Sequence, residues 1–420
     1  AAPSLARVSW ARDAWRAATV AAAVILIVGS IAALLLNRAT VTRIGASTAT
    51  PTQADSAPTI TPAPSATSFP TAPAGWRAIL PARRFAEGSG QGFAVSAARP
   101  GRLAGCGIPA VSAVAQAYPE LAISDDGGQT WKESDIQAAG TVTECSVVVD
   151  QLHPDTIIVG NADGSKLAVT TDAGQTWRPL PLPAGMAMNF TQAASSNSLV
   201  NGQLIGVFHN ISGSGRWELG DLSITGAFKV LDATLSYPTS AMNSPMALAV
   251  DPANASHVYV IAQGKRDSAH PTQDVLLFVT SNAGASWRQI HTFPYGERVS
   301  LWASTPGAIY LWVSYPEMSA NGNPLQVSFD GGVTWRDITS TNLRLDSPYF
   351  SPSGQIVLIT AGNSQATAAL EELNPATGKL TPMGPLPPLA ADGFTAVVTG
   401  GAHPVFVVAS SLATYVRPLP

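Results

Sequence analysis

The stretch Ser124-Asp-Asp-Gly-Gly-Gln-Thr-Trp131 returns three more times along this chain in varied form. The other copies are Thr170-Thr-Asp-Ala-Gly-Gln-Thr-Trp177, Thr280-Ser-Asn-Ala-Gly-Ala-Ser-Trp287 and Ser328-Phe-Asp-Gly-Gly-Val-Thr-Trp335. All of them fit the pattern Ser/Thr-x-Asp/Asn-x-Gly-x-Ser/Thr-Trp. A motif that recurs along a chain is the signature of a repeat architecture, so this motif decides the fold.

Each copy lies between two short apolar runs, which predicts a strand, a tight turn and a second strand. The Asp or Asn at the third position can accept hydrogen bonds from N–H groups of the turn. Glycine at the fifth position can adopt the positive φ that such a turn requires, and the tryptophan can bury its ring between neighbouring sheets. We expect the following residues to have structural roles: Asp126, Gly128, Trp131, Asp172, Gly174, Trp177, Asn282, Gly284, Trp287, Asp330, Gly332 and Trp335.

The pattern resembles the Asp-box, or BNR, repeat of sialidases, sortilin-type receptors, xyloglucan hydrolases and the photosystem II assembly factor family. In those families the boxes occupy hairpins between the third and fourth strands of β-propeller blades. The resemblance therefore implies a propeller that extends from about Trp76 to the end of the chain. It is specific for the fold and not for the function.

The spacing of the boxes indicates how many blades the propeller has. From Asp126 to Asp172, Asn282 and Asp330 the intervals are 46, 110 and 48 residues. Because the middle interval is about twice the others, we predict one blade without a box there, built from residues 199–207, 217–222 and 228–231.

Further strands follow the fourth box. Residues 355–360 predict a strand and 373–380 a hairpin turn without a box, which together indicate another blade. The last apolar runs supply only three strands, at residues 395–398, 405–409 and 412–416. We expect Trp76–Leu80 to be the missing fourth strand, because joining the two ends removes the exposed sheet edges. The predicted fold class is thus an all-β, seven-bladed β-propeller, with six or eight blades as the alternatives.

The residues before the propeller are typical of a membrane protein. Residues 17–37 carry no charge, and these 21 residues compare with the roughly 20 needed to span a bilayer. More arginines precede this segment than follow it, which favours a cytoplasmic N-terminus. A cleaved signal peptide is the alternative, although its apolar region is normally shorter.

The expected organisation has four parts. Residues 1–16 form a short cytoplasmic tail, 17–37 a transmembrane signal anchor, 38–75 a stalk rich in Pro, Thr, Ser and Ala, and 76–420 the propeller. The composition of the stalk predicts disorder, because it offers no apolar face to bury. This order places the protein at the cell membrane with its propeller outside the cytoplasm.

Composition limits the partners. The net charge is −4 and 12% of the residues are charged, without the clustered Lys and Arg of a nucleic-acid-binding protein. The only cysteines, Cys106 and Cys145, form a disulfide or remain two buried thiols, and the sequence leaves both open. No Cys/His spacing predicts zinc, and we expect neither a metal nor a cofactor.

The resemblance to sialidases makes glycosidase activity one hypothesis, but this chain lacks part of the sialidase sequence pattern. They carry an Arg-Ile-Pro element, three arginines that clamp the substrate carboxylate and a Tyr–Glu pair. This chain contains no Arg-Ile-Pro. Arg178, Arg288 and Arg336 each follow a box tryptophan, where strand alternation directs them toward neighbouring blades or solvent. A sialidase-like, exo-acting glycoside hydrolase is therefore the alternative hypothesis.

A binding or scaffold module for a protein or a glycan is the favoured hypothesis. In a propeller the loops between second and third strands lie on the face opposite to the boxes, and the longest polar ones here are 263–274 and 315–324. The resemblance to photosystem II assembly factors implies a non-enzymatic propeller that docks a protein, but their basic patch is absent. The candidate ligand-binding residues are Lys265, Arg266, Asp267, His270, Tyr315 and Glu317.

Overall fold

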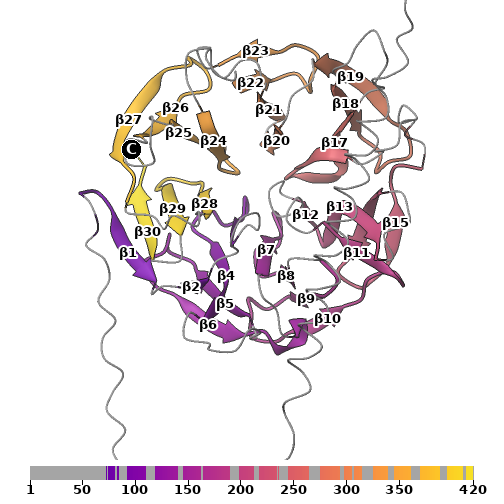
Figure 1. Ribbon diagram of the computed structural model, residues 1–420, viewed down its shortest axis with the longest axis horizontal. Helices are drawn as coiled ribbons and strands as arrows, with labels where there is room; N and C mark the ends of the chain where they lie inside the picture. Colours follow the sequence, from indigo (N-terminus) through magenta and orange to yellow (C-terminus); the bar gives the residue numbers. More distant parts are fainter. Residues whose placement is uncertain are drawn as a thin grey trace, which may run out of the picture. The chain divides into compact units, whose positions relative to one another are not determined.

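Seven antiparallel sheets surround a common centre in the computed structural model of this chain (Figure 1). They belong to a unit that spans Ala66–Pro420. The structure describes residues 72, 74–80, 83–84, 92–109, 119–140, 145–161, 164–189, 198–211, 217–233, 235, 245–263, 275–293, 298–304, 307–314, 325–338, 345–360, 369–387, 395–409 and 413–419.

The first three blades run from the inner strand to the outer strand as follows. Blade 1 contains β2 (Arg83–Arg84) and β3 (Phe93–Val95), both paired with β4 (Leu103–Pro109), then β5 (Glu120–Ser124) and β6 (Lys132–Asp135). Blade 2 contains β7 (Cys145–Val149), β8 (Ile157–Asn161), β9 (Leu167–Thr170) and β10 (Arg178–Leu180). Blade 3 contains β11 (Met186–Met188) and β12 (Leu199–Val200), both paired with β13 (Gln203–Asn210), then β14 (Glu218–Ser223) and β15 (Phe228–Val230).

The next three blades have four strands each. Blade 4 contains β16 (Pro245–Asp251), β17 (Asn254–Gln263), β18 (Val275–Thr280) and β19 (Arg288–Phe293). Blade 5 contains β20 (Arg298–Ser304), β21 (Ala308–Ser314), β22 (Leu325–Ser328) and β23 (Arg336–Asp337). Blade 6 contains β24 (Leu345–Phe350), β25 (Ile356–Thr360), β26 (Ala369–Leu373) and β27 (Leu380–Pro385).

Blade 7 joins the two ends of the propeller. Its strands β28 (Thr395–Val398), β29 (Val405–Ala409) and β30 (Thr414–Pro418) are completed by β1 (Arg77–Leu80) as the outermost strand. Arg77 lies opposite Val416 and Ala78 opposite Tyr415 in this antiparallel pair. The predicted closure by residues 76–80 and the seven-blade count are both confirmed.

The four boxes occupy the turns between third and fourth strands, as the resemblance implied. In the first box the Ser124 hydroxyl donates to Asp126 and accepts the N–H of Gly128 at 2.7 Å, and the other three boxes repeat this arrangement. Gly128 has a φ of 84° and its three counterparts are also positive. The residue before this glycine is left-handed as well, including Ala173 and Ala283 at 55° and 51°.

The core contains one apolar cluster between each pair of neighbouring blades, and a smaller one around Leu235, Ala262 and Phe278. Each box tryptophan packs at the seam with the preceding blade. Trp177 of blade 2 lies against the cluster shared with blade 1, and Trp335 of blade 5 against the cluster shared with blade 4. Trp76 takes the corresponding place in blade 7, at the seam with blade 6. The predicted burial of these rings between sheets is thus observed.

A disulfide links Cys106 of β4 to Cys145 of β7, two strands in adjacent blades. It lies in the apolar cluster between blades 1 and 2, where both residues are buried. Of the two alternatives that the sequence left open, a disulfide or two buried thiols, the structure has the disulfide.

The structure refines two parts of the predicted blades. Residues 199–207, predicted as part of the blade without a box, contain a hairpin, because Asn201 and Gly202 adopt φ values of 53° and 73° and reverse the chain between β12 and β13. The last strand spans Thr414–Pro418, two residues beyond the expected 412–416.

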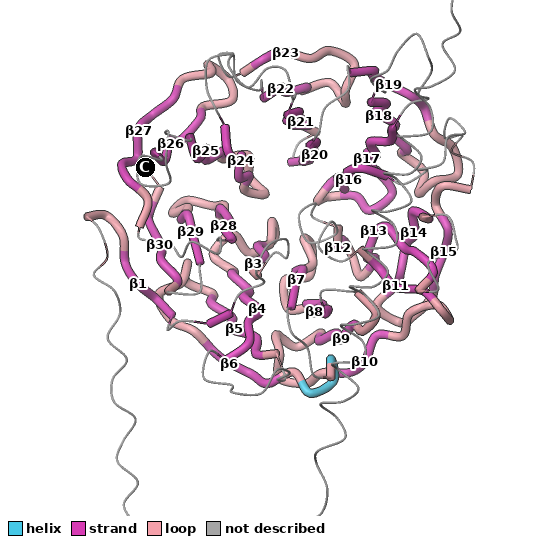
Figure 2. The backbone as a smooth tube through the Cα atoms, viewed as in Figure 1, coloured by secondary structure: helices cyan, strands magenta, loops and turns pink. Residues whose placement is uncertain are grey.

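Helical structure among the described residues is limited to the 3₁₀ turn η1 (Gln137–Ala139), seen in Figure 2. A search of these described residues finds no helix long and apolar enough to cross a bilayer. The predicted tail, anchor and most of the stalk lie outside the described residues.

Candidate functional site

The predicted ligand-binding residues lie outside the described part of the chain. Lys265, Arg266, Asp267 and His270 belong to the connection between β17 and β18, and Tyr315 and Glu317 to the connection between β21 and β22. Both connections join second to third strands, as predicted. The assignment of ligand binding to them stays a prediction.

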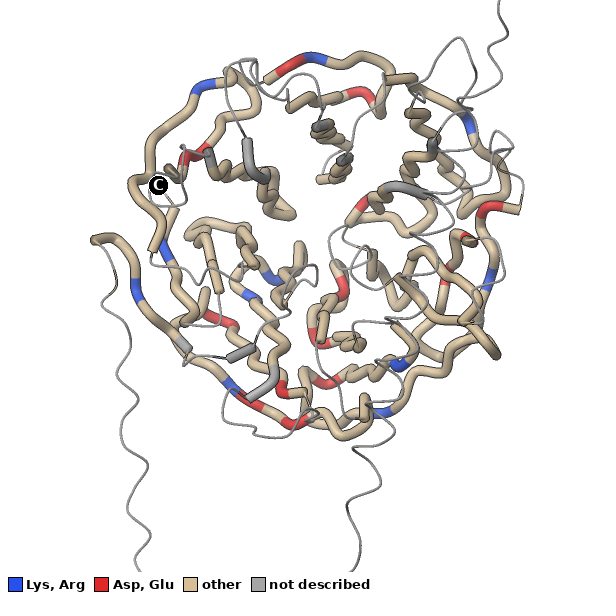
Figure 3. Tube along the Cα trace, viewed as in Figure 1, with Lys and Arg blue, Asp and Glu red and all other residues tan. Residues whose placement is uncertain are grey.

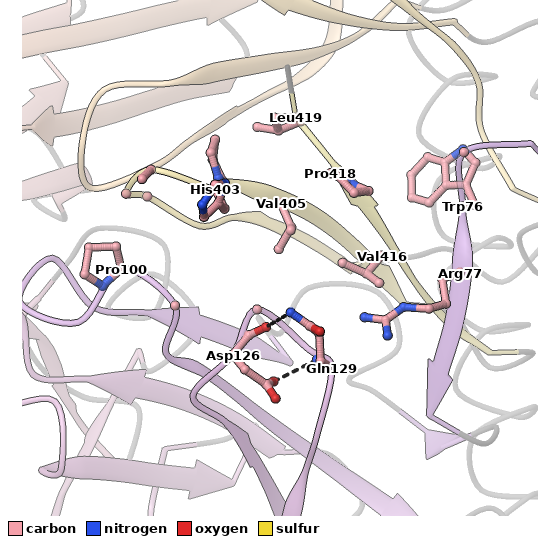
Figure 4. Close-up of a pocket in the computed structure, with 17 residues that line it drawn as sticks. Trp76, Arg77, Pro100, Asp126, Gln129, His403, Val405, Val416, Pro418 and Leu419 are labelled. Carbon is pink, nitrogen blue, oxygen red and sulfur yellow. Dashed lines mark hydrogen bonds between the residues drawn. The ribbon is translucent and has the colours of Figure 1, made fainter.

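A groove of about 760 Å³ lies where blade 7 meets blade 1 (Figure 4). Strand β1 and the residues just before it contribute Trp76 and Arg77, while the β28–β29 hairpin contributes His403 and Val405. The opposite wall comes from blade 1, with Pro100 before β4 and residues 126–129 of the first box. The groove therefore exists only because the two ends of the propeller meet.

The groove is mainly apolar, and three of its polar side chains, Arg77, Asp126 and Gln129, have partners within the protein. Arg77 Nη2 donates to the Gly128 carbonyl at 3.3 Å. Asp126 accepts from the N–H groups of Gln129 and Thr130, both at 2.8 Å, and Gln129 Nε2 donates back to the Asp126 carbonyl (Figure 4). The apolar lining consists of Trp76, Pro100, Ala402, Pro404, Val405, Val416, Pro418 and Leu419.

Asp126 gives one edge of the groove a fixed negative charge. Burial acts to raise the pKa of this carboxyl, but hydrogen bonds from Thr130, Ser124 and Gln129 outweigh it and lower the pKa to about 2. Asp126 is therefore ionised at neutral pH. His403 is exposed on the other side of the groove.

Sequence reasoning missed the role of the cations that begin the outer strands. Arg178 Nη2 donates to the Ile224 carbonyl of blade 3 at 2.6 Å, and Lys229 Nζ to the Ala283 carbonyl of blade 4 at 2.8 Å. Arg336 donates to two carbonyls in the β26–β27 turn of blade 6. Together with Arg77, each cation thus ties its blade to the next one.

An aromatic residue followed directly by a cation marks these blade-joining positions in the sequence. The aromatic residue packs toward the preceding blade and the cation points the other way, because successive strand residues point to opposite faces. Arg77, Arg178, Lys229 and Arg336 reach carbonyls of the following blade. The pairs are Trp76-Arg77, Trp131-Lys132, Trp177-Arg178, Phe228-Lys229, Trp287-Arg288 and Trp335-Arg336. Strand alternation directed Arg178 and Arg336 toward neighbouring blades or solvent, and in the structure both bind carbonyls of the neighbouring blade.

A buried arginine joins blades 1 and 2. Arg102 is 1% exposed and binds Asp125 of the first box, the Pro154 carbonyl and Asp155 of blade 2. Burial acts to raise the pKa of Asp125, but Arg102 and Arg99 lower it. Charged residues elsewhere are scattered singly or in small groups around the part of the ring that is drawn in colour (Figure 3).

The described residues contain no group of three His, Cys, Asp or Glu side chains that could hold a metal ion. Asp221 of β14 has a raised pKa of about 6, caused by burial, and Lys229 partly opposes this rise. Within the described residues Oδ1 of Asp221 lacks a hydrogen-bond partner. In the sheet Asp221 lies opposite Ile205 and Lys229, and neither of these neighbours is the second carboxylate that a glycosidase uses.

Comparison with known proteins shows the repeat and the fold. Residues 122–133 match the BNR/Asp-box repeat family. A comparison with curated proteins finds no match. Together with the seven blades, the repeat defines an Asp-box β-propeller.

Several solved structures with low sequence identity are similar to this chain. An oligogalacturonate lyase in complex with manganese is 12% identical, with a TM-score of 0.55 over 82% of this chain and 93% of that chain. YCF48 from Cyanidioschyzon merolae is 13% identical, with a TM-score of 0.48 over 82% and 99%. A Hadza microbial sialidase is 14% identical, with a TM-score of 0.39 over 78% and 64%. At these identities the likeness concerns the fold alone.

Proposed function

We propose that this protein is a membrane-anchored binding module whose propeller holds a segment of a partner protein outside the cytoplasm. The apolar groove between blades 7 and 1 carries this proposal. Ligand sites are concave and mostly apolar, and about 760 Å³ lies within the usual range of roughly 300–1,000 Å³.

The lining favours a polypeptide over a glycan. A glycan presents many hydroxyls, which need free polar side chains as partners. Arg77, Asp126 and Gln129 already bind within the protein, and Trp76 is largely buried. Beside the exposed His403, the groove therefore offers mainly proline and aliphatic surface. Apolar side chains of an extended segment fit such a surface.

A location outside the cytoplasm is supported by two features. Residues 17–37 have the length and composition of a signal anchor. The disulfide between Cys106 and Cys145 is of a kind that persists in oxidising compartments and is rare in the cytosol.

Site-specific photo-crosslinking tests the proposal. A photoreactive amino acid replaces Ala402, an exposed residue of the groove, and in a matched control replaces Ala376, an exposed residue in the β26–β27 turn. Irradiation of cells that make the full chain is expected to give a protein adduct from position 402 and none from position 376.

Three outcomes would contradict the proposal: no adduct, equal adducts at both positions, or an adduct within the same chain only. The last result would assign the groove to residues preceding the propeller. Turnover of a fluorogenic sialoside by the purified full chain would favour the glycosidase alternative instead.

A further inference from the structure

A second pocket, of about 390 Å³, lies at the seam between blades 4 and 5. Like the apolar groove between blades 7 and 1, this pocket is lined by the outer strand of one blade and by the box of the next blade. Arg288 lies opposite Val279 in blade 4 as Arg77 lies opposite Val416 in blade 7. The lining differs, because this pocket contains His257, Ser281, Ser286, Trp287, Arg288 and Asp330.

Among the described residues the guanidinium of Arg288 has no hydrogen-bond partner, whereas its counterparts are bound. Arg77, Arg178 and Arg336 each donate to a carbonyl of the next blade. Arg288 forms no hydrogen bond or ion pair with any residue of the described ranges, although the carboxylate of Asp330 lines the same pocket. Its donors are therefore available to a ligand.

The third box differs from the others in a way that frees a second donor. In the first, second and fourth boxes a threonine hydroxyl donates to the Asp carboxylate. In the third box Asn282 replaces Asp, and its Nδ2 donates to Ser286 Oγ at 2.9 Å. Ser286 is thus the acceptor, and its hydroxyl hydrogen has no acceptor among the described residues.

The other charged groups at the pocket leave it rich in donors. Asp330 already accepts from Ser328, Val333 and Thr334, including both the N–H and the hydroxyl of Thr334. Behind the pocket, Nδ1 of His257 lies 3.6 Å from Asp251 Oδ2. Arg288 and Ser286 therefore supply free donors to this pocket, while the ionised Asp330 has its oxygens occupied by the turn that it closes.

We propose that this pocket binds the carboxylate of a small ligand. Arg288 supplies the charge and a planar pair of N–H donors that matches a carboxylate, and the hydroxyl of Ser286 adds a neutral donor. Two sources of this chemistry are a sugar acid and the C-terminal carboxylate of a peptide. The site is separate from the apolar groove and does not depend on the function proposed for it.

Calorimetric titration of the full chain tests the site. The ligands are glucuronate and N-acetylalanine, and the neutral controls are glucose and N-acetylalanine amide. We expect a carboxylate to bind and its neutral counterpart to bind at least about tenfold more weakly, because the charge-assisted pair with Arg288 is lost. Binding of glucuronate would indicate a sugar acid as the ligand, and binding of N-acetylalanine would indicate the C-terminus of a peptide.

Variants locate the binding. Arg288→Gln is expected to weaken carboxylate binding about tenfold or more. Arg336→Gln is the matched control, since it removes an equivalent guanidinium that is already bound, and it should leave the affinity unchanged. Asn282→Asp restores an acceptor for Ser286 and adds a negative charge, so it should also weaken binding. Equal affinity of Arg288→Gln and the unaltered chain, equal binding of the neutral controls, or no carboxylate binding would overturn the proposal.

Discussion

At the scale of single residues, the third position of each box acts as the acceptor that closes the turn. Asp172 accepts from the hydroxyls of Thr170 and Thr176 and from the Thr176 N–H. These bonds lower the pKa of Asp172 to about 2. Hydrogen bonds from Thr334 and Ser328 likewise lower the pKa of Asp330 to about 2. The preference for the ionised form links turn stability to pH.

Asp172→Ala is expected to lower the free energy of unfolding by roughly 1–2 kcal/mol, because it removes these turn bonds. The folded pKa of about 2 is below the usual 3.8, so this contribution is present above about pH 4 and disappears as the pH falls toward 2. Chemical denaturation at several pH values measures it. A variant that differs equally from the unaltered chain at every pH would contradict the assignment.

Asp221 makes stability depend on pH in the opposite direction. Its folded pKa of about 6 is above the usual 3.8, so ionisation of Asp221 destabilises the fold as the pH rises from about 4 to 6. Asp221→Asn should therefore raise the free energy of unfolding at about pH 7 by roughly 1–2 kcal/mol, a figure reduced to allow for partial solvent screening. The same variant should have little effect near pH 4. Thermal melts at both pH values test this, and an equal gain at both would show that charge is not the cause.

At the scale of elements, neighbouring blades are joined by buried polar contacts as well as by apolar clusters. The carboxylate of Asp150, 0% exposed, accepts from Leu152 and His153 in its own turn and from Asn201 and Gly202 of blade 3. Gln151 donates to the Val95 carbonyl of blade 1. Blade 2 is thus fixed on both sides by the turn that follows β7.

The disulfide adds a covalent link at the seam between blades 1 and 2. Replacing Cys106 and Cys145 together by alanine opens a loop with a sequence separation of 39 residues. We expect the free energy of unfolding to fall by about 3–4 kcal/mol, mainly because the unfolded chain gains freedom. Denaturation with and without a reducing agent measures this. If reduction shifts the midpoint of the unaltered chain but not that of the double variant, the disulfide is the cause.

At the scale of the whole molecule, ring closure depends on a strand that precedes the rest of the propeller in sequence. Trp76 is 7% exposed, packs against Phe406 and donates from its indole to the Pro385 carbonyl at 3.0 Å. The residue after it, Arg77, reaches the first box. The first residues of the propeller therefore hold blades 6, 7 and 1 together.

Removal of residues 1–80 should consequently lower stability much more than removal of residues 1–71. The longer deletion removes β1 and the buried Trp76, and a buried tryptophan alone is worth about 3–5 kcal/mol. The shorter deletion leaves β1 intact and serves as the control. Similar melting temperatures for the two shortened chains would show that β1 does not close the ring.

The architecture was predictable from the sequence because its signals are local and periodic. Box spacing exposed the blade without a box, and the leftover run at residues 76–80 matched a blade with only three strands. The hairpin at Asn201-Gly202 was missed although an Asn-Gly pair within an apolar stretch is the strongest short hairpin signal, because the boundaries of this blade were drawn from apolar runs and not from turn residues. The apolar groove was also missed, since Trp76, Pro100 and Val405 are far apart in sequence and meet only when the ring closes.

One binding measurement tests the central claim most directly. The full chain is screened against a library of short displayed peptides and against an array of glycans. It is compared with Ala402→Trp, which fills the apolar groove, and with Ala376→Trp as the control on the β26–β27 turn. The account predicts that peptides with apolar residues or proline bind, and that only Ala402→Trp abolishes their binding. Binding to glycans alone, or peptide binding that Ala402→Trp leaves intact, would contradict it.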